Sequence, residues 1–284
     1  MTTAANGVRP MGDRTRDTSV FDAIPSETTA EDRGALLLLR ERAREAQRYV
    51  YLEIGSYLGG TLQPFYADDR CSLIYSIDAR PDVVPDARGR QFYHYDRQVN
   101  AAATMLANLA KAFPAAGASK VRTFDSEVSG VDRALIAPPP HLCFIDAEHT
   151  NAAVFTDFLF CLEVSRPDAI VAFHDAGIVF EGIRRIERHL ADTAVRFRGL
   201  KLAGSVYAIL LGDAVDRHAA AIEPYTIDAE TYFGAAERTL AAQRAEYGRL
   251  GTGTVKRALA RAPLVFKAAR AVKRFFMPPR KGSI

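Results

Sequence analysis

Short apolar segments alternate with longer segments of helical periodicity between residues 31 and 212. Within the longer segments, apolar residues recur at spacings of three and four, as on one face of a helix. The pattern predicts helices at 31–47, 61–67, 99–113, 151–164 and 182–190. It predicts strands at 49–54, 73–77, 120–124, 141–145, 169–173, 194–200 and 205–211. Such alternation is typical of a parallel sheet with helices on both faces.

The last two expected strands are joined by only a few residues around Gly204. A crossover helix does not fit in so short a connection, so these strands should form an antiparallel hairpin at the sheet edge. The predicted fold is therefore α/β and Rossmann-like, with a mainly parallel seven-stranded sheet and an antiparallel C-terminal edge hairpin. Residues 1–30 show no period and are expected to be a mobile segment. Residues 31–212 would form the domain, and residues 213–284 a helical extension.

Polar residues follow five of the expected strands. They are Glu53, Gly55, Ser56, Asp78, Asp125, Ser126, Asp146, His174 and Asp175. Because open α/β sheets bind ligands at the carboxyl ends of their strands, we expect these side chains to surround one site.

The segment 53–61 is a glycine-rich turn between a strand and a helix. Glycine allows a close approach of the backbone to a ligand, and amides at a helix start suit a carboxylate or phosphate. Asp78 stands where an acid holds ribose hydroxyls in nucleoside-binding sheets. A tight turn without ligand and a capping aspartate are the alternatives at these two places. The absence of Gly-x-Gly-x-x-Gly argues against a dinucleotide.

Four motifs in this order resemble a known family. They are Tyr51-Leu-Glu-Ile-Gly-Ser-Tyr-Leu-Gly-Gly-Thr61, Tyr75-Ser-Ile-Asp78, Phe144-Ile-Asp-Ala-Glu-His149 and Val171-Ala-Phe-His-Asp175. Together they resemble class I S-adenosylmethionine (SAM) dependent methyltransferases related to macrolide-sugar O-methyltransferases and to the cephalosporin-cluster methyltransferase. The resemblance spans about residues 48–212.

The resemblance implies roles for matching positions. Glu53, Gly55 and Ser56 would line the methionine part of SAM, and Asp78 would hold its ribose. Asp125 and Ser126 would lie near the adenine, and Asp146 beside the sulfonium and the acceptor. The resemblance also places two further residues of the glycine-rich turn, Tyr57 and Thr61, at the cofactor.

Some relatives bind a divalent ion, and the matching positions are Asp146, His174 and Asp175. The two carboxylates suit Mg²⁺, whereas a histidine favours softer ions such as Mn²⁺ or marks a general base. A metal could lower the pKa of the acceptor hydroxyl, or His149 or His174 could remove its proton. Catalysis is therefore expected to involve Asp146, His149 and His174, with the metal left open. Relatives often have Gly-Asp-His where this chain has Ala147-Glu148-His149, which leaves the orientation of His149 less certain.

Composition fits an ordinary globular protein, with 48% hydrophobic and 25% charged residues. The three cysteines lack metal-site spacing and are expected to be reduced and buried, which fits a cytoplasmic location. No signal peptide or membrane span is expected.

Charge is distributed unevenly along the chain. Ten of the 37 Lys and Arg residues lie from Arg249 onward, where no acidic residue occurs. The preceding part has 27 basic against 34 acidic residues. Residues 255–281 are expected to include a basic amphipathic helix, which could lie on an anionic inner membrane surface or pack on protein. The acidic body and the lack of a binding motif argue against nucleic acid.

The leading hypothesis is a SAM-dependent O-methyltransferase acting on a small molecule, sugar or glycolipid. One alternative is a Rossmann-like oxidoreductase that uses NAD(P). The other is a non-catalytic membrane-surface protein on the same fold, against which the ionisable cluster at the strand ends argues. A homo-oligomer is compatible with each hypothesis.

Overall fold

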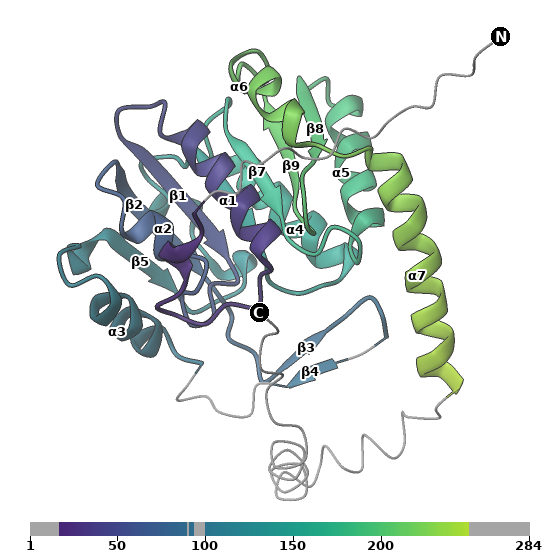
Figure 1. Ribbon diagram of the computed structural model, residues 1–284, viewed down its shortest axis with the longest axis horizontal. Helices are drawn as coiled ribbons and strands as arrows, with labels where there is room; N and C mark the ends of the chain where they lie inside the picture. The colour runs from purple at the N-terminus through teal and green to yellow at the C-terminus, as the bar shows by residue number, and fades with distance from the viewer. Residues whose placement is uncertain (1–16, 90, 94–99, 250–284) are drawn as a thin grey trace, which may run out of the picture.

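A seven-stranded sheet forms the centre of the protein, as seen in the computed structural model, which describes residues 17–89, 91–93 and 100–249 (Figure 1). Its strands are β1 (Tyr49–Ile54), β2 (Cys71–Ile77), β5 (Val121–Phe124), β6 (Leu142–Ile145), β7 (Ile170–Phe173), β8 (Phe197–Lys201) and β9 (Tyr207–Leu211). They are ordered β5-β2-β1-β6-β7-β9-β8, and only β9 is antiparallel to its neighbours. This confirms the predicted fold and its C-terminal edge hairpin.

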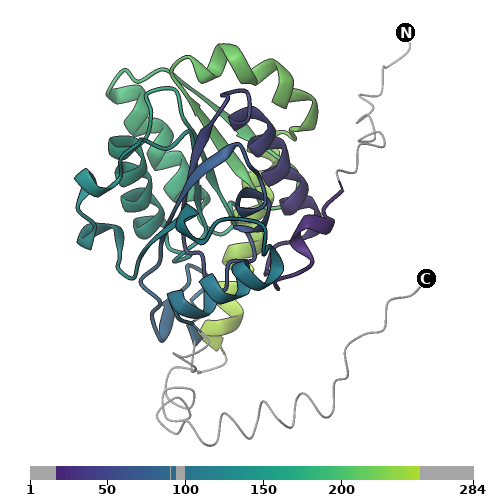
Figure 2. The same cartoon turned by 90° about the vertical axis from the view of Figure 1, so that its left-hand side faces the viewer.

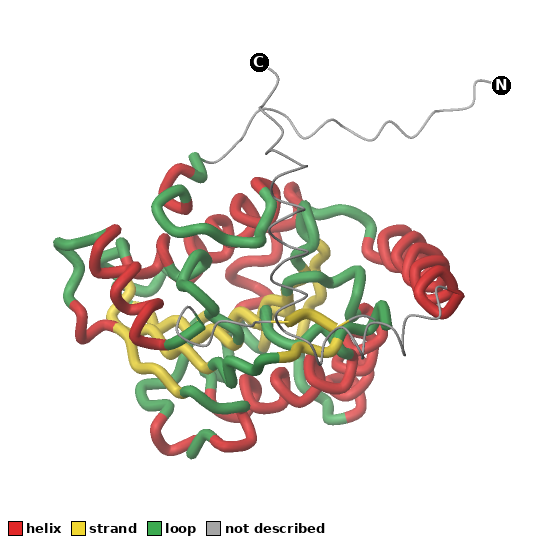
Figure 3. Tube along the Cα trace, turned by 90° about the horizontal axis from the view of Figure 1, so that it is seen from below, coloured by secondary structure: helices red, strands yellow, loops and turns green. Residues whose placement is uncertain are grey.

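Helices cover both faces of the sheet, as Figures 2 and 3 show. One face carries α1 (Ala30–Ala43), α2 (Gln63–Tyr66), α3 (Ala102–Ala112) and α6 (Ala214–Ile222). The other carries α4 (Asn151–Val164), α5 (Phe180–Asp192) and α7 (Ala229–Arg249). In β1, Tyr49 and Tyr51 face the first layer, while Val50 and Leu52 face the second. Burial on both sides explains why the strands are almost continuously apolar.

Some predicted boundaries differ from the observed ones. The helix expected at 31–47 ends at Ala43, and the helix expected at 99–113 begins at Ala102. The strand expected at 194–200 begins only at Phe197, because Ala194 adopts a φ of +54° in the turn after α5. A residue in the left-handed region interrupts an extended strand.

Residues 17–29 are packed on the domain, unlike the mobile segment that the sequence predicts for residues 1–30. A 3₁₀ turn at Ser19–Phe21 buries Phe21, and Ile24 is buried nearby. The Gln63 side chain donates to Phe21 O and Ile24 O at 2.8 and 2.9 Å and accepts from Ile24 N at 2.9 Å. Two isolated apolar residues show no period, so the pattern gave no sign of this packing. Residues 1–16 lie outside the described part.

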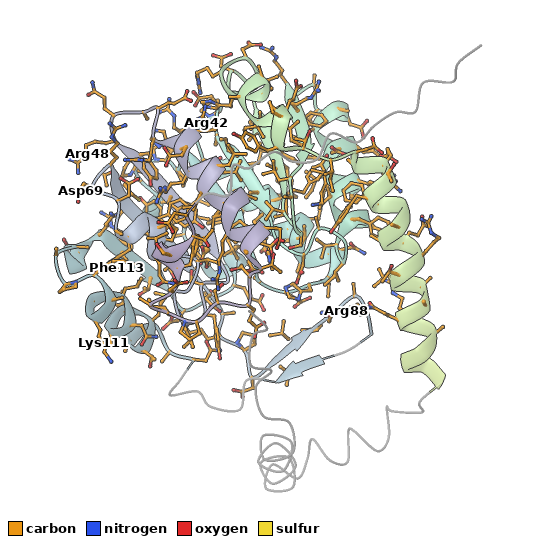
Figure 4. The ribbon with its side chains drawn as sticks, in the orientation of Figure 1. Arg42, Arg48, Asp69, Arg88, Lys111 and Phe113 are labelled. Carbon is orange, nitrogen blue, oxygen red and sulfur yellow. The ribbon has the colours of Figure 1, made fainter. Side chains whose placement is uncertain are left out.

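A small antiparallel hairpin stands between β2 and α3, where the sequence predicts neither strand. It consists of β3 (Val83–Pro85) and β4 (Gln91–Tyr93). Ala87 N donates to His149 O at 2.8 Å, and Arg244 of α7 donates to Ala87 O at 2.7 Å. Arg88 stands at the loop of the hairpin beside α7 (Figure 4). Strands of three residues are too short to show an alternating pattern.

After β9 the described chain continues through α6 and α7 to Arg249. Phe233 and Leu240 of α7 are buried against the layer of α4 and α5. The basic stretch 255–281 lies outside the described residues. Within the part that is described, no helix is long and apolar enough to cross a membrane.

Candidate active site

A cavity of about 640 Å³ opens at the carboxyl ends of β1, β2, β6 and β7. Its walls come from the strand ends, from the segment before α1, from the β3 hairpin and from α4. Gly55 and Asp78, which the sequence predicts to face one crevice, both line it, and so do His149 and His174. One cavity therefore contains both the expected nucleoside-binding residues and the expected catalytic residues.

The glycine-rich turn brings two strand ends into contact. Gly55 has a φ of +92°, and a Cβ atom at this position would lie 2.1 Å from the backbone oxygen of Asp146. Only glycine fits here, both for its φ and for this close approach. Tyr57, which also has positive φ, donates its backbone N–H to Asp78 Oδ2 at 2.8 Å. Arg80 N donates to Asp78 Oδ1 at 2.8 Å, so the Asp78 carboxylate is fixed at the cavity wall.

Glu53 does not line the cavity, although the resemblance places it at the methionine part of SAM. It is fully buried beneath the turn and accepts hydrogen bonds from Tyr51 Oη at 2.5 Å and Thr61 Oγ1 at 2.8 Å. Burial raises the pKa of Glu53 to about 8, against these hydrogen bonds, which lower it. Thr61 and Ser56 do line the cavity. Glu53 therefore supports the turn from below.

Asp125 points away from the cavity, in contrast to the prediction that it lies near the adenine. Its side chain is 59% exposed, and its Oδ1 lies 3.0 Å from Arg80 Nε. Ser126, the next residue, lines the cavity as expected. Successive residues after a strand point in different directions, which spacing alone does not reveal.

His174 lies between two carboxylates at the end of β7. Its Nδ1 is 3.0 Å from Asp146 Oδ1, and its Nε2 is 3.3 Å from Asp32 Oδ2. Burial lowers the pKa of His174, but the carboxylates of Asp146 and Asp32 outweigh it and raise the pKa to about 11. His174 is therefore an imidazolium at neutral pH. Burial raises the pKa of Asp146, but His174 and His149 hold it well below its usual range.

His149 is the second imidazole of the cluster. Its Nε2 lies 3.2 Å from Asp175 Oδ2 and 3.7 Å from Asp146 Oδ1. Burial lowers the pKa of His149, but these two carboxylates raise it above its ordinary value. Asp175 has a φ of +50° and donates its backbone N–H to Ser205 Oγ at 3.2 Å. Both carboxylates of this cluster thus have an imidazole partner.

The donors at Asp146, His174 and Asp175 do not fit the predicted divalent ion in this arrangement. They lie close to one another, since His174 Nδ1 lies 3.0 Å from Asp146 Oδ1 and 3.8 Å from Asp175 Oδ2. A protonated imidazole has no lone pair for a metal. Across residues 17–89, 91–93 and 100–249, no group of three His, Cys, Asp or Glu side chains could hold a metal ion.

Asp32 belongs to this cluster, and the sequence analysis did not single it out. It is the N3 residue of α1 and forms a capping box with Thr29. Asp32 Oδ1 also accepts from Ser205 N at 2.6 Å. The Thr-x-x-Asp pattern could have located the helix start, but the contact with His174 joins residues 142 positions apart, which only the tertiary structure brings together.

A second acidic group lines the cavity between the end of β5 and α4. It consists of Glu127, Glu148 and Asp157. Asp157 is only 8% exposed. Burial raises the pKa of Asp157 to about 7, and the charges of Glu148 and Glu127 add to this. In the sequence, Asp157 stands among apolar residues of the helix expected at 151–164, and this position could have indicated a buried carboxyl.

Residues 52–176 match the profile of the methyltransferase domain family. No curated protein matches the chain. The chain is similar to the O-methyltransferase TomG of Streptomyces achromogenes in complex with SAM, at 20% identity over 68% of this chain and 88% of that one, with a TM-score of 0.47.

Two further solved structures are similar. One is an O-methyltransferase of Bacillus cereus in complex with S-adenosylhomocysteine (SAH), at 17% identity over 69% of this chain and 91% of that one, with a TM-score of 0.44. The other is a putative O-methyltransferase of Klebsiella pneumoniae, at 15% identity over 73% and 92%, with a TM-score of 0.45. All three scores lie below 0.5, so these likenesses carry no conclusion about activity. The profile match identifies residues 52–176 of this chain as a methyltransferase domain.

Proposed function

We propose that this protein transfers the methyl group of SAM to a hydroxyl group of a small molecule, sugar or glycolipid. One observation carries the proposal: Gly55 and Asp78, on neighbouring strands, line the same cavity as the His149–Asp175 pair. The methyltransferase domain at residues 52–176 agrees with it. The oxidoreductase and the non-catalytic alternative find no support in the comparisons.

The cavity walls fit SAM. Gly55 packs directly on the backbone of Asp146 at the cavity wall, and the Asp78 carboxylate is oriented by two backbone N–H groups. Gly55, Ser56, Tyr57 and Thr61 would hold the methionine part, and Asp78 the ribose hydroxyls. When bound, SAM supplies a methyl group on a sulfonium, which is a good leaving group.

His149 is the base in this proposal. His174 lies between Asp146 and Asp32 and remains protonated, so it has no lone pair to accept a proton. His149 lines the cavity, and the carboxylate of Asp175, 3.2 Å away, makes its imidazole more basic and stabilises the imidazolium formed by proton transfer. Asp146 links the two imidazoles and keeps them in place.

The acceptor would lie between the two segments that extend over the strand ends. Pro25, Ser26 and Glu27 form one wall, and Val83 to Pro85 of the β3 hairpin form the other. These walls offer apolar surface for the body of an acceptor and a few polar groups for its hydroxyls. The backbone bond between Ala87 and His149 connects the hairpin to the proposed base.

A divalent ion held by Asp146, His174 and Asp175, such as Mg²⁺ or Mn²⁺, is the rival to the His149 mechanism. The pairing of these donors with one another argues against it. Membrane contact through residues 255–281, a cytoplasmic location and a homo-oligomer remain proposals from the sequence. Liposome flotation tests the first, because a chain shortened after Gly248 should lose binding to anionic vesicles that the full chain retains.

Calorimetric titration with SAH tests the proposed function. The protein should bind SAH and should show no heat with NAD. Asp78→Asn should weaken SAH binding about tenfold or more, because an ionised acceptor of two ribose hydroxyls is lost. Glu163→Asn, a change at an exposed carboxylate of α4, is the control. Absence of SAH binding by the folded wild-type protein would overturn the proposal.

A further inference from the structure

The acidic group on the α4 wall of the cavity lacks the partners that buried carboxyls normally have. Asp157 lies on α4 with 8% of its surface exposed, and it lines the cavity. Among the described residues, none donates a hydrogen bond to its carboxyl group or forms an ion pair with it. Buried polar groups are almost always hydrogen-bonded, so a group left without a partner at a cavity wall indicates a missing ligand.

The position of Asp157 identifies the part of the ligand it faces. Ser126, Val128 and Ser129 follow β5, and β5 is the neighbour of β2, whose end carries Asp78. A nucleoside whose ribose is held at Asp78 therefore extends its base toward the segment after β5, and α4 packs against that segment. Asp157 lines this side of the cavity, whereas His149 and His174 follow β6 and β7.

We propose that the Asp157 carboxyl group recognises the Watson–Crick edge of adenine, accepting a hydrogen bond from the 6-amino group and donating one to N1. The inference rests on the proposed function and deepens it, since it assigns the residue that binds the 6-amino group of the cofactor. It also replaces Asp125, which is exposed and pairs with Arg80 outside the cavity.

The protonation that this pairing requires agrees with the surroundings of Asp157. Burial and the neighbouring charges of Glu148 and Glu127 raise the pKa of Asp157 to about 7, so the carboxyl carries a proton in much of the population near neutrality. A protonated carboxyl has one O–H donor and a carbonyl acceptor, which match N1 and the amino group of adenine.

The test compares SAH with its purine analogue, in which a hydrogen atom replaces the 6-amino group. Wild-type protein should bind SAH about tenfold more tightly, because the analogue keeps N1 but leaves the Asp157 carbonyl without its donor. Asp157→Leu should bring this ratio close to one. Asp157→Asn should keep the preference for SAH, since a carboxamide offers the same donor and acceptor as the protonated acid.

Asp192→Leu is the matched control, because it makes the same change at an exposed aspartate in the last turn of α5. It should leave the ratio at the wild-type value. Asp157→Ala replaces the leucine variant if that one does not fold. The inference fails if Asp157→Leu or Asp157→Ala keeps the wild-type ratio, or if Asp157→Asn loses it. A folded wild-type protein that binds neither nucleoside overturns the proposed function itself.

Discussion

Two acidic groups line the cavity, and their side chains are paired in different ways. At the ends of β6 and β7, Asp146 and Asp175 each have an imidazole within 3.2 Å or less. On the α4 wall, the carboxyl groups of Glu127, Glu148 and Asp157 have no basic partner among the described residues. Carboxylates with imidazole partners can keep a fixed geometry through a reaction, whereas carboxyls without a basic partner are completed by a ligand.

Removing the proposed base should have the largest effect. His149→Gln is expected to lower kcat by about 10²–10⁴-fold while the affinity for SAH changes little, because a general base acts only in the chemical step. Turnover is measured with radiolabelled SAM and an acceptor drawn from a panel of methyl glycosides and phenols. His189→Gln, a change on α5 at a ring that contacts Phe155, is the control. Unchanged kcat in His149→Gln would remove His149 from the mechanism.

Removing the Asp32 carboxylate, which lies beside His174, should reduce stability. Asp32→Asn leaves the His174 imidazolium with one carboxylate fewer, in a site where Asp32 is 2% exposed. The free energy of unfolding should fall by about 3 kcal/mol, since one partner of a buried ion pair has been removed. Urea unfolding measures this. Asp22→Asn removes a carboxylate that is 71% exposed and should change stability by less than about 0.5 kcal/mol. Equal effects would show that Asp32 does not support His174.

Asp157, which has no basic partner, should make the stability of the protein depend on pH. In the folded protein Asp157 has a pKa of about 7, whereas in the unfolded chain it has the ordinary aspartate pKa of 3.8. Wild-type stability should therefore fall as pH rises from about 4 to about 7, by up to about 4 kcal/mol from this residue. Asp157→Asn lacks this loss, so it should be more stable than wild type at pH 8 and similar at pH 4. Urea unfolding at both pH values is the measurement, and a variant no more stable at pH 8 would contradict the assignment.

Removal of metal ions should have the smallest effect. If Asp146 and Asp175 have imidazoles as their partners and no metal ion, methyl transfer should survive treatment with EDTA and desalting without measurable loss. Zinc-loaded and magnesium-loaded samples serve for comparison. Loss of activity that Mg²⁺ or Mn²⁺ restores would return these residues to the role of metal ligands and replace His149 as the activating group.

Parts of the site could be predicted and parts could not, for a physical reason. Gly55, Asp78 and His174 stand directly at strand ends, and the parallel strands bring such positions to one edge whatever the loops do. Glu53 lies two residues before Gly55, within β1, and points into the packed layer, where it bonds to Tyr51 and Thr61. Asp125 instead pairs with Arg80, a contact between distant segments that strand spacing does not reveal.

The amino-acid sequence by itself determined the seven-stranded sheet, its edge hairpin and the polar strand ends, because local periodicity and turn residues specify these within a few positions. Only the tertiary structure decided which charges meet. It brings Asp32 to His174, leaves Asp157 without a partner and sets the β3 hairpin against His149, since these contacts join distant segments and depend on how whole helices pack. Pairing across such distances sets the charge state of each group and thereby its role.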